Sequence, residues 1–146
     1  MSDTVQESSS STANAASLDR ERAGGRPVVG VALGAVAVVH LAITPVVYAD
    51  SSRSIRDAGI VGSVDADPEL VDLRSASFWY ASSGWAMLLL AVLIGRVERR
   101  EGVVPAPAVW GLAGISLWGL LFMPVSGFLA LLGVASYAGL RRRRRA

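Results

Sequence analysis

The chain has 146 residues, 52% of them apolar, and a formal net charge of only +2 at pH 7. This length allows one domain, and the apolar fraction exceeds what a soluble domain of this size usually carries, so the composition favours a membrane protein. The absence of cysteine excludes disulfides, thiolate metal sites and cysteine nucleophiles. All 14 basic residues are arginines gathered in clusters, a distribution that does not indicate a nucleic-acid surface.

The N-terminal segment, residues 1–26, is rich in Ser, Thr, Ala and acidic side chains and lacks aromatic residues and isoleucine. Such a segment cannot bury enough apolar area to offset the entropy that the chain loses on ordering. We predict a disordered tail here.

Residues 27–49 predict the first transmembrane helix. These 23 residues contain no Asp, Glu, Lys or Arg and a single histidine, His40, and at about 1.5 Å per residue they can cross a hydrocarbon core of about 30 Å. One face of the helix is made mostly of small residues, on which a second helix can approach closely. That face comprises Gly30, Gly34, Ala37, Leu41 and Thr44.

A cleaved signal peptide is the rival interpretation of this segment, because Val47-Tyr48-Ala49 has the small-residue pattern of a cleavage site. The apolar run is longer than a signal core of about 7–15 residues, and it contains His40 and Pro45. We therefore favour a helix that stays in the protein.

Residues 50–74 form the longest polar connection, with six acidic residues and three arginines, and we expect them to be extracytoplasmic. A short surface helix is predicted over residues 51–58. Asp67-Pro68-Glu69 has the pattern of an N-cap, a first-turn proline and a first-turn acid. The second long helix should therefore begin near Pro68 and enter the bilayer near Ser75.

Residues 75–95 predict the second transmembrane helix. Phe78-Trp79-Tyr80 places three aromatic side chains at one depth, as expected at the lipid headgroups. Small residues again dominate one face, so we expect this helix to pack against the first. The face comprises Ser77, Ala81, Gly84, Leu88, Ala91 and Gly95.

The last long apolar stretch must fold back on itself. No charged side chain occurs in the 39 residues from Gly102 to Leu140, which as one helix would overshoot the hydrocarbon core. The reversal is predicted at Pro124, Ser126 and Gly127, because proline cannot extend the preceding helix and glycine tolerates the backbone angles of a tight turn.

This reversal predicts a third transmembrane helix at residues 106–122 and a fourth at residues 125–140. A short charged turn at residues 95–106, containing Glu98 and Pro105, is expected before the third helix. The chain would end on a basic tail at residues 141–146.

The arginine distribution predicts the orientation of the chain. With four passes, eleven arginines lie on one side and three on the other, and this bias places both termini in the cytoplasm. A basic run that directly follows a span is an orientation signal that meets anionic lipid, so nucleic acid is not an expected partner. The signal consists of Arg141, Arg142, Arg143, Arg144 and Arg145.

Several of these features together resemble a family of short four-helix bacterial membrane proteins, known only as a domain of unknown function. The most specific element is Met123-Pro124-Val125-Ser126-Gly127-Phe128, although Leu129 stands where the family commonly has a second aromatic residue. The resemblance covers residues 27–141 and implies a fold and a membrane location, but no activity, ligand or catalytic residue. The other matching positions are His40, Phe78, Trp79, Gly84, Glu98 and Pro105.

His40 is the candidate intramembrane polar site, since an ionisable group inside a span is costly and often functional. In the structural interpretation its neutral imidazole bonds across helices, for instance to Ser82 or Ser83. In the functional interpretation it belongs to a proton or ligand pathway. Haem ligation is disfavoured, because the chain has no second histidine.

Two further patterns are weaker hints of chemistry. Asp65-x-Asp67-x-Glu69 resembles a fragment of a calcium loop but lacks its central glycine and distal glutamate, so we interpret it as a solvated, capping loop. Ser126 would need a base, and only His40 is a candidate, so we assign this serine to the turn itself. We expect no enzyme activity, no metal and no cofactor.

The sequence therefore predicts an all-α protein, a four-transmembrane-helix bundle built of two hairpins in the cell membrane. The function we expect is that of a structural or interaction component, with the lipid bilayer, a second copy or another membrane protein as partner. The alternative is a small transporter or permease-like subunit with His40 in a polar pathway. Four spans are few for a transporter, so that alternative needs a homodimer or a partner.

Overall fold

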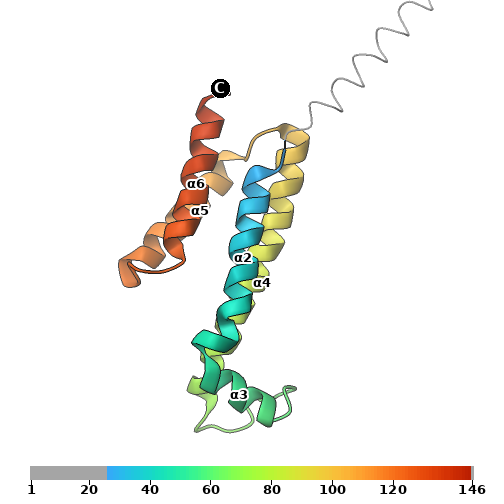
Figure 1. Cartoon of the computed structure of the whole chain (residues 1–146), viewed down its shortest axis with the longest axis vertical. Helices are drawn as coiled ribbons and strands as arrows, with labels where there is room; N and C mark the ends of the chain where they lie inside the picture. The colour runs from blue at the N-terminus through green and yellow to red at the C-terminus, as the bar shows by residue number, and fades with distance from the viewer. Residues whose placement is uncertain (1–25, 146) are drawn as a thin grey trace, which may run out of the picture.

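The computed structural model describes residues 26–145, and over this range the chain is all-α (Figure 1). The tail predicted at residues 1–26 lies outside the described residues except for Arg26, and so does Ala146. The helices are α2 (Val28–Val47), α3 (Ala49–Asp57), α4 (Val71–Glu101), α5 (Ala106–Phe122) and α6 (Phe128–Arg143).

The long helices form two antiparallel pairs, α2 with α4 and α5 with α6 (Figure 1). The pairs meet where α2 and α4 contact α6, near the end of the molecule that holds the C-terminus of α6. Elsewhere the two pairs lie apart, and α3 packs across the opposite end of the α2–α4 pair. We call these the arginine-rich end and the α3 end.

The small-residue faces of α2 and α4 lie against each other. A Cβ atom placed on Gly30 would lie 2.5 Å from the Cα of Gly95 and 2.9 Å from the carbonyl oxygen of Ala91, so the two backbones are almost in contact. Gly34 is less crowded, since its Cβ would meet only the Cβ of Ala91 at 3.7 Å. Close approach of this kind requires glycine at the first position and explains why small residues recur on both helices.

The α5–α6 pair also packs closely over a glycine. The ring of Phe128 lies directly over Gly119, where any side chain would collide with it. Leu112 and Ser116 are buried on α5, and Leu131, Ala135 and Ala138 are buried on α6. The buried Ser116 hydroxyl donates to the carbonyl oxygen of Leu112, 2.6 Å away, so this polar group is paired inside the interface.

The helix α4 is ten residues longer than the predicted span at residues 75–95. The segment expected as a charged turn is helical through Glu101, and the chain leaves the helix at Gly102, which has a φ of 75°. Arg and Glu are good helix formers, and cations in the last turn favour the helix dipole. At its other end α4 begins at Val71, because Asp67 caps a separate turn by accepting the N–H of Glu69 at 3.0 Å.

The other boundaries also shift. The helix α2 ends at Val47, two residues after Pro45 removes a helical hydrogen bond, and α3 begins at Ala49. The helix α6 spans Phe128–Arg143, later than the predicted 125–140, because the residues before Phe128 form the turn and the arginines continue the helix. The predicted basic tail is therefore helical in its first three residues.

Two helices, α2 and α4, are long and apolar enough to cross a membrane. The helix α5 is apolar as well, but it has only 17 residues. Within the described residues, 28% of the apolar window of α2 and 22% of that of α4 is buried by the protein itself.

Candidate functional site

The most completely buried charged group in residues 26–145 is the carboxylate of Glu98, which is 0% exposed. Its Oε2 accepts the backbone N–H groups of Val29 at 2.9 Å and Gly30 at 3.2 Å, in the first turn of α2. Its Oε1 accepts from the guanidinium of Arg141 on α6, which is 19% exposed. We call this the Glu98 junction.

The Glu98 junction joins three helices at one point. A helix N-terminus carries unpaired N–H groups and a positive dipole end, and both favour a carboxylate there. The Arg141 guanidinium supplies the opposite charge and also donates to the carbonyl oxygen of Arg26 at 3.3 Å. These hydrogen bonds and the ion pair offset the free-energy cost of burying the carboxylate. The same contacts link the α2–α4 pair to the α5–α6 pair.

Two more C-terminal arginines hold the connection between α4 and α5. Arg145 donates to the carbonyl oxygen of Gly102 at 2.8 Å, and Arg142 donates to that of Val104 at 3.3 Å. The basic run, predicted only as an orientation signal, therefore also fixes the ends of three helices in place.

The His40 imidazole lies between α2 and α4, toward the α3 end. Its Nε2 is 3.0 Å from the Oγ of Ser83 and 3.1 Å from the carbonyl oxygen of Tyr80, and its ring stacks on the Tyr80 ring with centroids 3.8 Å apart. A carbonyl oxygen only accepts, so a hydrogen bond to Tyr80 requires the tautomer with the proton on Nε2. Of the two serines proposed as partners, His40 contacts Ser83 and not Ser82.

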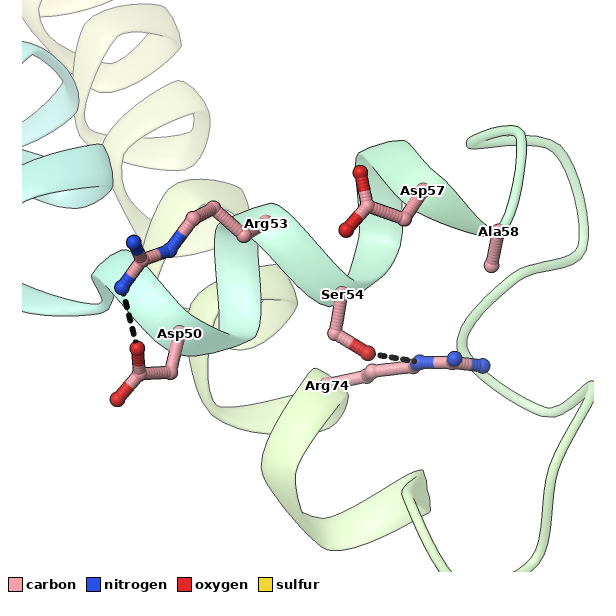
Figure 2. A pocket seen from close by; sticks show the side chains of 6 residues that line it. All are labelled: Asp50, Arg53, Ser54, Asp57, Ala58 and Arg74. Carbon is pink, nitrogen blue, oxygen red and sulfur yellow. Dashed lines mark hydrogen bonds and ion pairs between the residues drawn. The ribbon is translucent and has the colours of Figure 1, made fainter.

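At the α3 end, a second buried charge holds the loop before α4. Figure 2 shows the guanidinium of Arg74 reaching past Ser54 toward that loop. Arg74 is 7% exposed and donates through Nε to Ser54 at 2.8 Å and through Nη1 to the carbonyl oxygen of Ser63 at 2.7 Å. The groove in Figure 2 is lined by Arg74 and also by Asp50 and Arg53, which form an exposed ion pair at 2.5 Å, so charges of both signs line it.

The turn before α6 uses its serine locally. The hydroxyl of Ser126 donates to the carbonyl oxygen of Met123 at 2.7 Å and accepts the N–H of Phe128 at 3.4 Å. Pro124 and Gly127 lie in the same turn, and no hydrogen bond links Ser126 to His40 among the described residues. No group of three or more His, Asp or Glu side chains within residues 26–145 is placed to hold a metal ion.

The sequence prediction of a short charged turn at residues 95–106 does not identify the Glu98 junction. A signal was present. Glu98 continues the small-residue face of α4 at the same alternating spacing of three and four residues, and Arg74 precedes that face by three residues. A charge that falls on a helix–helix contact face must be paired.

These features define an all-α protein with two long apolar helices and, between its two helix pairs, an ion pair whose carboxylate is fully buried. The chain belongs to the family of unknown function DUF6463, whose model matches residues 25–145. No curated protein and no solved structure matched the chain. This match confirms the resemblance to a domain of unknown function.

Proposed function

We propose that this chain is a multi-pass integral protein of the cell membrane, with four spans formed by α2, α4, α5 and α6, and that it acts as a non-enzymatic structural or interaction component. The observation that carries the proposal is the apolar surface that the two helix pairs leave uncovered. Large apolar side chains are exposed along all four helices, including Trp79 at 69%, Trp118 at 68% and Leu121 at 73%. A core helix of a water-soluble domain would bury such side chains, whereas lipid covers them without cost.

The charge distribution supports four passes. The four long helices alternate in direction (Figure 1). The arginine-rich end therefore holds Arg26, the α4–α5 connection and the C-terminus of α6. The positive-inside rule assigns that end to the cytoplasm. Helices α5 and α6 have 17 and 16 residues, about 25 Å each, which slight bilayer thinning or snorkelling arginines accommodate.

The packing of α2 argues for its retention rather than its cleavage as a signal peptide. Val29, Leu33 and Ala37 are fully buried, and the first-turn N–H groups of α2 bind the Glu98 carboxylate. Removing α2 would expose the carboxylate and the glycine face of α4 together.

Membrane integration is tested by fractionation. We expect the full chain to stay in the membrane pellet after washing at alkaline pH and to be released only by detergent, because its apolar surface has no cover in water. Release by the alkaline wash alone would contradict the proposal.

The geometry around His40 favours the structural interpretation over the transporter-like alternative. Its donor is engaged by Ser83 and by a backbone carbonyl group, and its ring is stacked on Tyr80. These contacts join α2 to α4, which is what an interhelical hydrogen bond in a membrane protein is expected to do.

Replacing His40 with glutamine separates the two interpretations. We expect His40→Gln to lower the stability of the protein in nanodiscs by about 1 kcal/mol or less, because the amide can donate to the same oxygens. Tryptophan fluorescence between about pH 5 and 8 should follow the same course in both proteins. A transition in the wild type that disappears in the variant would favour the proton-pathway function instead, since glutamine cannot titrate.

A further inference from the structure

The arginine-rich end carries more cations than the protein itself uses. Residues 96–101 and 141–145 contain eight arginines and two glutamates. Glu98 is neutralised by Arg141, and Arg142 and Arg145 donate to backbone carbonyl oxygens, which are uncharged. The end of the molecule therefore keeps a strong positive charge after its internal contacts are made.

Five of these arginines point outward. They are exposed, and none has a side-chain hydrogen bond or ion pair with another residue of the range 26–145. They come from the ends of two adjacent helices, because Arg145 and Arg141 tie α6 to the end of α4. We call them the outward arginines: Arg96, Arg99, Arg100, Arg143 and Arg144.

Exposed apolar side chains adjoin the outward arginines. Leu140 is 58% exposed directly before the basic run, and Leu93 is 47% exposed one turn before Arg96. A ligand that covers both must combine an anionic group with an apolar body. A nucleic acid offers only the first, whereas a phospholipid offers both in the required order, with its phosphate at the helix ends and its acyl chains along the helices.

We propose that the outward arginines form a binding surface for anionic phospholipid headgroups in the cytoplasmic leaflet. The inference rests on the membrane insertion proposed above, and it assigns different roles to two sets of arginines. Arg141, Arg142 and Arg145 hold the helix ends, and the outward arginines hold lipid phosphate. Arginine suits this task because its planar guanidinium can donate two parallel hydrogen bonds to a phosphate group.

The test compares lipid retention by the purified full chain. Wild-type protein is extracted from nanodiscs that contain phosphatidylglycerol and phosphatidylcholine, and the retained lipids are counted by native mass spectrometry. We expect a preference for phosphatidylglycerol that falls about thirty-fold in the Arg143→Ser/Arg144→Ser variant, equivalent to about 1 kcal/mol per arginine. The matched control is Arg53→Ser/Arg56→Ser, which removes two exposed arginines at the α3 end and should keep the preference.

The different roles of the two sets of arginines allow a second comparison. Arg142→Ser/Arg145→Ser should lower the thermal stability of the protein in phosphatidylcholine alone, whereas Arg143→Ser/Arg144→Ser should not.

An inserted chain without a preference for phosphatidylglycerol, or with the same preference in the Arg143→Ser/Arg144→Ser variant, would overturn this inference alone. Displacement of the bound lipid by a short DNA duplex would overturn it in favour of a nucleic-acid surface. A chain that never enters the nanodisc would overturn the membrane proposal as well.

Discussion

Replacing Glu98 with glutamine is expected to destabilise the protein by about 3 kcal/mol, the largest loss among single substitutions that preserve side-chain size. The change leaves the Arg141 guanidinium without its counter-charge and weakens acceptance of the N–H groups of Val29 and Gly30. Removing one partner of a buried ion pair costs more than the pair itself contributes, because the other charge stays behind. The measurement is the free energy of unfolding in mixed detergent micelles.

Glu101→Gln is the matched control for that substitution. Glu101 lies three residues further along the same helix and is exposed, so we expect its loss to change stability by no more than about 0.5 kcal/mol. Combining Glu98→Gln with Arg141→Gln should cost less than the sum of the two single changes, because the pair is coupled. Equal losses for Glu98→Gln and Glu101→Gln, or strictly additive effects in the double variant, would refute the Glu98 junction.

Replacing Gly30 with alanine is expected to cost about 1–3 kcal/mol, although alanine is the better helix former by about 1 kcal/mol. The added Cβ would lie 2.5 Å from the Cα and 2.7 Å from the backbone nitrogen of Gly95, and neither atom can move aside without separating the helices. The same unfolding measurement in micelles reports the loss.

Gly34→Ala provides the internal comparison for this contact. Its Cβ would meet the Cβ of Ala91 at 3.7 Å, an ordinary contact, so the substitution should leave stability unchanged or raise it slightly. Both glycines lie on the same helix and were predicted on the same face. Similar stabilities for Gly30→Ala and Gly34→Ala would show that the close approach at Gly95 does not limit packing.

The sequence was sufficient for the features that depend on periodicity. Small residues at helical spacing predicted that α2 and α4 would pack together, and the uncharged stretch broken at Pro124 predicted the α5–α6 reversal. These features follow from local chemistry: a glycine face permits close approach, and a proline ends a helix. The all-α class follows from the same patterns.

The polar contacts could not be predicted from the sequence, because they join residues far apart in the chain. Glu98 and Arg141 are 43 positions apart, and nothing local distinguishes Arg141 from the four arginines after it. His40 could have bonded to either neighbouring serine. The orientation of α4 about its axis relative to α2 brings Ser83 to His40.

The central claim, four membrane spans with both termini in the cytoplasm, is tested most directly by single cysteines, because the chain has none of its own. Val61→Cys lies in the loop before α4, and Val125→Cys lies at the tip of the α5–α6 pair, where the native side chains are 93% and 94% exposed. Glu101→Cys lies at the arginine-rich end. On intact cells, a membrane-impermeant maleimide should label the cysteines at 61 and 125, and it should label the cysteine at 101 only after permeabilisation. Protection of the cysteine at 125, or labelling of the one at 101 without permeabilisation, would contradict the account.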